Sequence, residues 1–428
     1  MMFKKYDAYK DSGVEWLGQL PESWDLLPNK HIFKLKKNLV GKRSKEYELL
    51  SLTLNGVIKR DMENPEGKFP AEFDTYQEVK SGDFIFCHFD VEETPRTVGL
   101  SRFDGMITGA YTVYQVNAKK FCPNFLYYFY LNLDTGKRLK PLYKGLRNTI
   151  GKDIFGEFKT FIPNYSEQVK ISNFLDQKVT EIDQAIAIKK QQIALLNERK
   201  QIVIQKAVTQ GLDPNVPMKD SGVEWIGQIP EHWEVKKIKY ATKIFRGKFT
   251  HRPRNDPSLY DGKYPFFQTG DVAKAGKFLV DFKQTLNEKG LRVSTLIPKG
   301  TVVITIAANI GDVSILGIDA CFPDSIVGFQ PKELLDRDFL FYSLLSMKNQ
   351  FVNSSIKNTQ MNLNVDRIGS NYICVCPKDE QINIVEKIEE FNANFENAIN
   401  LLNREIGKLK EYKATLINDA VTGKIKVA

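Results

Sequence analysis

The sequence of 428 residues has few cysteines and no long hydrophobic run. Its most apolar stretch, residues 301–308, is far too short to span a bilayer, and the first ten residues, MMFKKYDAYK, lack the apolar segment of a secretory signal. The five cysteines form no paired framework, which is typical of reduced thiols in a cytosol-like compartment. These absences predict a cytoplasmic protein.

Motifs for metal binding and catalysis are also missing. The four histidines are scattered, and Cys374 and Cys376 stand alone in an apolar stretch, where packing in a strand is the favoured interpretation. The chain has neither the Asn/Asp-Pro-Pro-aromatic motif of amine methyltransferases nor a Walker loop, G-x-x-x-x-G-K-[ST]. Two acid-x-Lys triplets of the nuclease type, residues 157–159 and 281–283, arise by chance in so charged a chain. We expect no metal site and no catalytic residue.

The composition is that of a folded protein with a basic charge balance. Hydrophobic residues make up 42% and charged residues 26%, close to the average for globular proteins. The 61 Lys and Arg outnumber the 52 Asp and Glu, giving a formal charge of +9, which favours a polyanionic partner without requiring one. The length predicts two to four domains.

An internal repeat organises the chain. Residues 10–24, KDSGVEWLGQLPESW, and residues 219–233, KDSGVEWIGQIPEHW, are identical at 12 of 15 positions. A second pair, IPNYSEQVKISNFL from Ile162 and CVCPKDEQINIVEKI from Cys374, runs from proline through Glu-Gln into a helical pattern. The chain is therefore two tandem halves.

Between the repeated segments the halves diverge. These divergent parts hold short β-branched and aromatic runs, interrupted by Gly, Pro and Asn, at residues 83–89, 107–116, 301–306 and 325–329. They predict two mixed α/β domains dominated by strands, with one scaffold and two different surfaces.

Each half ends in a long helical pattern with a heptad seam. The seam positions are Leu175, Ile182, Lys189, Leu196 and Val203 with Val179, Ile186, Ile193, Lys200 and Ala207, and, 213 residues later, Ile388, Phe395, Leu402, Leu409 and Leu416 with Asn392, Ile399, Ile406, Lys413 and Ala420. A helix of about 45 residues is about 67 Å long, so it is a spacer. We predict that the two helices pair antiparallel. For Lys200 and Lys413, which interrupt the seams, we favour exposed or snorkelling side chains over a role in register.

This layout resembles the specificity subunits of type I restriction-modification enzymes over essentially the whole chain. The resemblance rests on GVEWLGQLPESW and GVEWIGQIPEHW, the Glu-Gln helix entries, QTGDV at 268–272, IPKGTVVITIAANIG from Ile297, and TQMNLNV from Thr359. The first half departs from the last motif, with GLRNT at 145–149.

The resemblance implies an α+β fold with two β-rich target recognition domains in pseudo-twofold tandem, separated by two antiparallel coiled-coil helices. We accordingly expect recognition domains at residues 1–161 and 213–374, and spacer helices at residues 162–212 and 375–428. Each domain is expected to read one half of a bipartite, asymmetric DNA site. The implied partners are double-stranded DNA, two modification (methyltransferase) subunits and restriction subunits that translocate and cut. S-adenosylmethionine, ATP and Mg would be used by those partners, and this chain would bind no cofactor.

The residues themselves indicate where DNA contacts lie. A basic run follows each tryptophan segment, as expected for phosphate contacts; the runs are Lys34, Lys36, Lys37, Lys42, Arg43 and Lys45, and Lys236, Lys237, Lys239, Lys243, Arg246, Lys248, Arg252 and Arg254. Arg, Asn and Gln are the residues that read base edges. The predicted DNA-binding set is Lys42, Arg43, Asn55, Arg96, Arg102, Arg147, Asn148, Arg246, Lys248, Arg252, Arg254, Gln268, Thr269, Asn309, Gln360 and Asn362.

The bland alternative for each of these residues is a turn or a solvated surface position. Tryptophans 16, 24, 225 and 233 are predicted to be packing anchors, because they occur in segments shared by halves that would read different sequences. Two other functions stay open: a self-contained restriction enzyme or DNA-binding protein of another restriction-modification type, and a coiled-coil scaffold. The divergence of the two domains argues against the scaffold.

Overall fold

The computed structural model describes residues 3–13, 18–61, 72–307, 309–354 and 364–427. By its internal contacts the chain forms two compact units, Met1–Lys189 with Asn403–Ala428, and Lys190–Leu402. Each unit is mixed α/β. Among the described residues, no helix is both long and apolar enough to cross a membrane.

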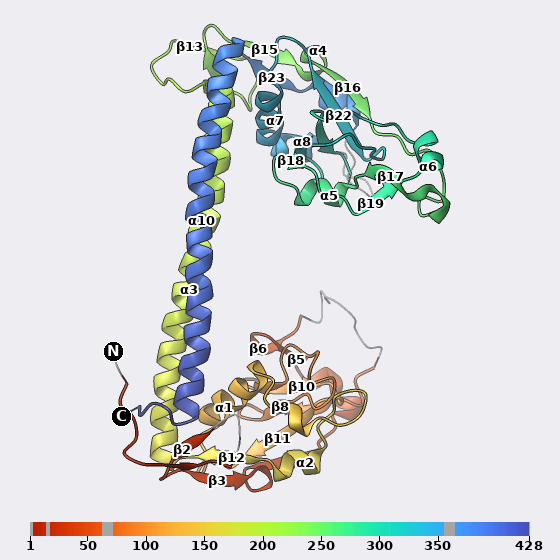
Figure 1. Cartoon of the computed structure of the whole chain (residues 1–428). Coiled ribbons are helices and arrows are strands. Elements are labelled where there is room, and N and C mark those ends of the chain that lie inside the picture. Colours follow the sequence, from red (N-terminus) through yellow and green to blue (C-terminus); the bar gives the residue numbers. More distant parts are fainter. Residues whose placement is uncertain (1–2, 14–17, 62–71, 308, 355–363, 428) are drawn as a thin grey trace. The chain divides into compact units, whose positions relative to one another are not determined.

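The first unit is built on an antiparallel sheet in the order β4-β11-β8-β9, formed by Phe33–Lys36, Thr112–Val116, Phe84–Phe86 and Val98–Leu100 (Figure 1). Its two-stranded pairs are β1 (Tyr9–Asp11) with β2 (Gln19–Pro21), β3 (Asp25–Pro28) with β12 (Lys159–Ile162), β5 (Leu50–Thr53) with β6 (Gly56–Lys59), and β7 (Gln77–Val79) with β10 (Gly105–Ile107). The short helices are η1 (Asn29–His31), η2 (Gly41–Glu46), α1 (Pro123–Thr135), η3 (Lys140–Leu142) and α2 (Lys152–Glu157).

An aromatic cluster forms much of the core of this unit. The ring of Phe33 packs edge-on against Phe84, Phe86 and Tyr130, with centroids 5.3–5.7 Å apart. Edge-to-face pairs of this kind add to the stabilisation that burial of the rings supplies. His88 lies in the same cluster, stacked on Phe86 at 5.5 Å. The aromatic runs seen in the sequence are therefore core rather than surface.

The second unit repeats this plan with an added parallel strand. Its sheet has the order β16-β22-β20-β21-β18, formed by Thr242–Arg246, Ile326–Pro331, Val302–Thr305, Val313–Leu316 and Phe278–Leu279, with only the β18–β21 pair parallel among these. The other pairs are β13 (Met218–Asp220) with β14 (Gln228–Pro230), β15 (Glu234–Lys237) with β23 (Tyr372–Val375), and β17 (Tyr260–Phe266) with β19 (Gln284–Leu286). The short helices are α4 (Ile238–Ala241), η4 (Pro257–Leu259), α5 (Thr269–Lys274), α6 (Glu288–Arg292), α7 (Arg337–Ser346), α8 (Lys348–Ser354) and α9 (Val365–Ser370).

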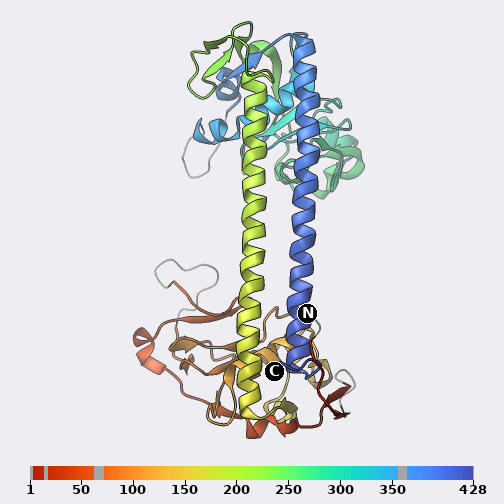
Figure 2. The ribbon, with the colours of Figure 1, turned by 90° about the vertical axis from the view of Figure 1, so that its left-hand side faces the viewer.

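Two long helices complete the fold. α3 spans Tyr165–Gln210 (46 residues) and α10 spans Lys378–Val421 (44 residues). Both lie inside the ranges expected for the spacers, whereas β12 and β23 each run one residue past the expected ends of the recognition domains. In each unit a segment of α3 lies beside a segment of α10 (Figure 2). In the first unit the segments run antiparallel, because Asp183 pairs with Lys413 and Lys189 with Glu405.

The lysines that interrupt the heptad seams form ion pairs with the facing helix. Lys413 lies 2.7 Å from Asp183 in the first unit, and Lys200 lies 3.3 Å from Glu396 in the second. Asp183 and Glu396 are themselves 213 residues apart, so the two bridges are equivalent. The side chains do snorkel, at 28% and 22% exposure, as predicted, but the pairing also favours one register of the helices, the role that we did not favour from the sequence.

The repeated tryptophans bury their rings against the end of a long helix. Trp24 and Trp233 are fully buried and donate through Nε1 to Glu167 (3.4 Å) and Glu380 (3.1 Å). The glycine that ends α3, Gly211, lies against Trp233, and the glycine that follows α10, Gly423, lies against Trp24. Both glycines have positive φ, +76° and +71°, and a Cβ on either would reach 3.3–3.4 Å from the tryptophan ring. This dock explains why the tryptophan segments and the Glu-Gln segments recur together.

The glutamine of each Glu-Gln pair joins the long helix to a shorter one. Gln168 donates to the carbonyl of Pro163 and accepts from the N–H of Cys122, which precedes α1, both at 2.8 Å. Gln381 donates to Cys376 and accepts from the N–H of Asp336, which precedes α7, both at 2.7 Å. Both glutamines are buried, so these bonds satisfy backbone groups that would otherwise lack partners.

Candidate nucleic-acid interface

The first basic run lies on and beyond β4, and one of its members is not available to DNA. Lys36 is buried and its Nζ lies 2.8 Å from Asp83 Oδ2, with side-chain exposures of 7% and 5%. The interpretation of Lys36 as a phosphate contact is therefore wrong, because β4 turns this side chain into the unit rather than toward solvent. The other five cations of the run are exposed, among them Lys42 and Arg43 of η2, where Arg43 lies over the ring of Tyr47.

Arg96 holds a loop of its own unit. Its Nη1 lies 3.2 Å from Asp134, a carboxylate only 2% exposed that also accepts from Thr97 and pairs with Lys137. Arg96 itself is 16% exposed. The second unit holds its corresponding loop with a pair of reversed polarity, Lys348 with Asp312 at 2.6 Å. The geometry favours a structural role for Arg96, which anchors the segment before β9.

Asn55 and Arg102 come together at one pocket. Asn55 is exposed at the turn between β5 and β6, and Arg102 is exposed just after β9. Both line a cavity of about 450 Å³ together with Phe103, Tyr127 and other side chains. The structure thus brings together two predicted residues that lie far apart in the sequence.

Arg147 and Asn148 lie on a loop pinned to a neighbouring loop. Arg147 forms a bidentate pair with Asp90, at 3.1 and 2.5 Å, and lies over the ring of Phe89. Asn148 donates to Glu93 at 3.3 Å. The hydrogen bond from Arg147 lowers the pKa of Asp90, so the pair is charged at neutral pH. Arg147 remains 68% exposed and presents its outer face to solvent.

The second unit gathers four predicted cations at the end of β16 and on the loop that follows it. Arg246, Lys248, Arg252 and Arg254 are all exposed. Three of them converge on Asp324: Arg246 donates to its carbonyl at 2.5 Å, Arg252 lies 3.9 Å from its carboxylate, and Arg254 forms an ion pair with it. This loop carries the densest positive charge among the predicted contacts.

The remaining predicted contacts have local roles or lie outside the described residues. Gln268 precedes α5 and forms a capping box with Asp271, whose carboxylate accepts the Gln268 N–H at 2.8 Å; its Nε2 donates to Gln284 at 3.1 Å. Thr269 begins α5 and is half-buried. Asn309 is exposed in the loop between β20 and β21. Gln360 and Asn362 lie outside the described residues, as does Trp16.

The thiols and acids provide no catalytic cluster in the described part of the chain. Cys374 lies in β23 and Cys376 follows it; both are buried and free, as the strand interpretation predicted, and burial raises the pKa of Cys374 to about 12. Glu157, from one acid-x-Lys triplet, forms an ion pair with Lys30 at 2.8 Å. The described residues contain no group of three His, Cys, Asp or Glu placed to hold a metal ion.

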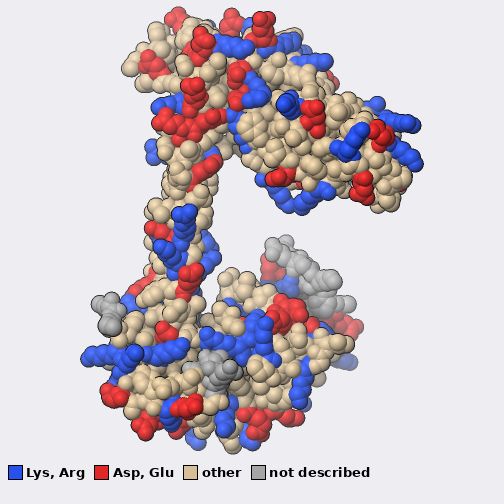
Figure 3. Space-filling view, viewed as in Figure 1, with Lys and Arg blue, Asp and Glu red and all other residues tan. Residues whose placement is uncertain are grey.

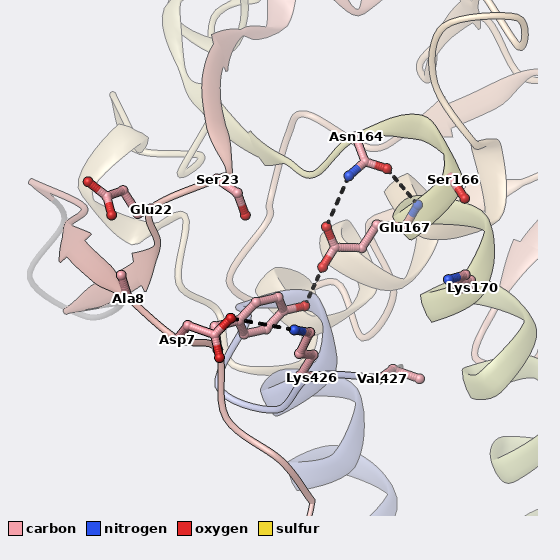
Figure 4. Close-up of a pocket in the computed structure, with 11 residues that line it drawn as sticks. Asp7, Ala8, Glu22, Ser23, Asn164, Ser166, Glu167, Lys170, Lys426 and Val427 are labelled. Carbon is pink, nitrogen blue, oxygen red and sulfur yellow. Dashed lines mark hydrogen bonds and ion pairs between the residues drawn. The ribbon is translucent and has the colours of Figure 1, made fainter.

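A cavity of about 640 Å³ lies where the first and last segments of the chain meet the start of α3 (Figure 4). Its polar groups pair with one another: Tyr6 donates to Glu167 at 2.6 Å, Asn164 bonds to Glu167, and Lys426 lies 3.9 Å from Asp7. Backbone bonds between Lys4 and Lys426 close the same junction. The lining groups stabilise the first unit by joining its terminal segments.

Charge on the visible face is mixed rather than uniform. Figure 3 shows lysine and arginine side chains interspersed with acidic ones over each unit. Single-sign fields steer a polyanion broadly, whereas mixed surfaces confine attraction to particular loops. The candidate DNA interface is therefore a set of loops, and the loop after β16 is its most basic member.

Comparisons with known proteins agree with this architecture. Residues 230–404 match the type I restriction modification DNA specificity domain. The MjaX type I restriction enzyme specificity subunit of Methanocaldococcus jannaschii is 24% identical over 441 residues, covering 100% of this chain and 99% of that protein. The MjaVIII specificity subunit of the same organism is 26% identical over 336 residues, 74% of each chain. In sequence the chain is thus similar to type I restriction enzyme specificity subunits over its whole length.

Solved structures show the same fold. A chain from a study of complex assembly and conformational transition of the type I restriction-modification system has a TM-score of 0.68 at 13% identity, covering 94% of this chain and 98% of that one. The HsdS subunit of Thermoanaerobacter tengcongensis has a TM-score of 0.51 at 14% identity, covering 97% and 100%. The mixed α/β composition and the two long helices of this chain fit that fold.

Two structurally important acids carried no sequence signal. Asp324 and Asp83 occupy loops of the divergent parts, where the two halves cannot be compared. The glutamates of the Glu-Gln pairs, by contrast, were visible as a repeat, and their position beside the tryptophans is the signal that explains them.

Proposed function

We propose that this specificity subunit recognises a bipartite, asymmetric DNA sequence, with one half-site read by each unit. The observation that supports this proposal is the division of labour between repeated and divergent residues. Repeated residues pack within the scaffold: the rings of Trp24 and Trp233 are buried and bond to Glu167 and Glu380. The divergent loops, by contrast, carry exposed Arg, Lys and Asn side chains. A scaffold used twice with two different surfaces suits two different half-sites.

We further propose that the two recognition domains are arranged in tandem with pseudo-twofold symmetry and that α3 and α10 form an antiparallel coiled coil that sets the spacing between half-sites. The equivalent bridges Lys200–Glu396 and Lys413–Asp183 support one register. The matching strand orders of the two main sheets support the tandem plan.

The partners we propose are two modification subunits, joined by restriction subunits. An exposed apolar stripe on α3 supports this part of the proposal: Ile188, Leu195 and Ile202 recur every seven residues at 57%, 56% and 46% exposure. Leu195 also lines a groove of about 460 Å³ with Leu401 of α10. Apolar surface of this kind is typical of a protein interface.

Replacing Leu195 and Leu401 by glutamate should abolish co-purification with the modification subunits, because two carboxylates would lose hydration at the interface. Gln191→Glu, which adds one carboxylate at an exposed position of α3, serves as the control beside each single glutamate variant. Retained assembly of the double variant would place the modification subunits elsewhere.

We propose that the chain itself is non-catalytic and binds no cofactor, and that it acts in the cytoplasm with partners that use S-adenosylmethionine, ATP and Mg. Single-molecule mapping of methylated adenines in the genome of the source cell tests recognition directly. The expected result is methylation of one bipartite, asymmetric motif that disappears when the gene is deleted. A palindromic motif would contradict two different readers, and turnover of DNA by the purified chain alone would contradict the non-catalytic assignment.

A further inference from the structure

The loop after β16 is held rigid by its backbone. Gly247 donates to Ile326 and Lys248 donates to Phe322, at 2.9 and 3.0 Å, and Ser294 Oγ bonds the carbonyl of Lys248 at 2.8 Å. At Gly247 the two chain segments approach so closely that a Cβ would lie 2.2 Å from the carbonyl oxygen of Pro323. Glycine is therefore required here, and the basic loop is pressed onto the segment that carries Asp324.

Asp324 orients two guanidinium groups of this loop while leaving most of their donors free. Arg246 uses its Nε on the Asp324 carbonyl, and Arg254 uses one Nη2 on the Asp324 carboxylate. A guanidinium has five N–H donors in a planar fork, so both side chains keep N–H groups for a further acceptor. Arg252 differs, because its Nη1 is bonded to the carbonyls of Phe249 and His251, both at 2.8 Å.

The carboxylate also changes what these cations attract. Three exposed arginine side chains converge on one acid that is 36% exposed. A fixed negative charge repels a phosphate, which carries a full charge, more than it repels the neutral acceptors of a base edge. Exposed ion pairs contribute little to stability, so the Asp324 contacts are easily exchanged when a base is offered.

We propose that Asp324 is a positioning residue for DNA recognition by the second unit: its carboxylate orients Arg254 toward base acceptors, beside Arg246 held by its main-chain carbonyl, and suppresses sequence-independent phosphate binding. This inference rests on the proposed function. Its consequence is that removing the carboxylate strengthens binding to nonspecific DNA and weakens discrimination at one half-site, whereas loss of an ordinary structural residue would weaken both half-sites or the fold.

The test uses the full chain assembled with its modification subunits and a random-sequence duplex library. Selection with the wild-type complex defines the motif, and Arg254→Gln identifies the half-site read by the second unit through its loss. For Asp324→Asn we expect discrimination at that half-site to fall about tenfold. The other half-site should be unchanged, and a nonspecific duplex of the same length should bind more tightly with a steeper dependence on salt.

Asp281→Asn is the matched control, because Asp281 is an exposed acid of the same unit and its loss changes the net charge equally. Asp324→Glu, unlike Asp324→Asn, should keep the discrimination of the wild type, since a carboxylate remains within reach of the arginines. If Asp324→Asn lowers the melting temperature, two other variants are compared instead: Arg254→Lys alone, and Arg254→Lys combined with Asp324→Glu. The glutamate should then give no rescue of discrimination, because lysine lacks the guanidinium fork that the carboxylate orients.

Discrimination by Asp324→Asn equal to wild type, or a change equal to that of Asp281→Asn, would overturn the inference. Rescue by glutamate in the Arg254→Lys background would do the same. A wild-type complex that enriches no motif at all would instead refute the proposed function, so the two failures are distinguishable.

Discussion

Replacing Lys36 by methionine tests whether the first basic run contains a structural lysine beside lysines that contact DNA. Lys36 and Asp83 form a buried pair at 2.8 Å with exposures of 7% and 5%. Removing one partner of a buried pair leaves an uncompensated charge and costs about 3–5 kcal/mol. Asp83 also accepts the N–H of Lys80 at 2.8 Å, which retains part of its hydrogen bonding, so we expect the lower end, about 3 kcal/mol.

The matched variants are Lys37→Met and Lys42→Met, which make the same chemical change at exposed positions of the same run. Surface changes of this kind alter the free energy of unfolding by about 0.5 kcal/mol or less. If these lysines contact phosphates, each substitution should reduce the salt slope of DNA binding by about 0.9. Lys36→Met should leave that slope unchanged.

Two assays separate these effects. Native-state hydrogen exchange of peptides from β8 and β11 reports the stability of the first unit by itself, and duplex binding between low and moderate salt reports phosphate contacts. Equal protection in Lys36→Met and Lys37→Met would refute the argument from the buried pair. A reduced salt slope without loss of protection would return Lys36 to the DNA interface.

Three further predictions concern the helix dock, a buried histidine and the spacer. Gly423→Ala should destabilise the first unit by more than 1 kcal/mol, because φ is +71° and the new Cβ would lie 2.3 Å from Pro21 Cδ. Gly407→Ala, at an open position within α10, should instead stabilise the unit by about 1 kcal/mol. Urea unfolding measures both effects, and equal effects would contradict the dock. Burial lowers the pKa of His88 to about 4, so the unfolded chain binds a proton below pH 6.5 that the folded chain does not bind until about pH 4. The contribution of neutral His88 to stability, about 3 kcal/mol, is complete above pH 6.5 and is lost as the pH falls to 4. His88→Phe should remove this part of the pH dependence of the free energy of unfolding. An unchanged pH profile would show that His88 is not buried in its neutral form. Deleting one heptad from both α3 and α10 should shorten the spacer between methylated half-sites by about three base pairs, since seven residues span about 10 Å, and altered half-sites would contradict the ruler role.

Short-range pattern accounts for most of the fold that the sequence predicted. The β-branched runs became β8, β10, β11, β20 and β22, and the proline-free stretches became α3 and α10, because strand and helix periodicity depends on neighbours within a few residues. Trp24 and Trp233 were predicted to be packing anchors from their repetition alone, and their burial confirms this. Their hydrogen bonds to Glu167 and Glu380 were not predicted, since the partners are more than 140 residues away.

The individual contacts were harder, because a cation in a loop looks the same whether it faces solvent or an acid. Lys36 and Lys37 are adjacent, yet Lys36 is buried against Asp83 at the end of β4 and Lys37, just after the strand, is exposed. Arg96 and Arg102 are both arginines close to β9 in the sequence, but only the fold places Asp134 beside Arg96.

By itself the sequence determined the duplicated plan, the two long helices and the family resemblance, since repeats, heptads and motifs can be recognised along the chain. Only the tertiary structure decided which charges are free to meet DNA. Which charges are free depends on acids such as Asp83, Asp134 and Asp324. Each contacts a cationic residue that lies 38 to 78 positions away in the sequence. Electrostatic pairing acts over a few ångströms of space, and no pattern along the chain records that distance.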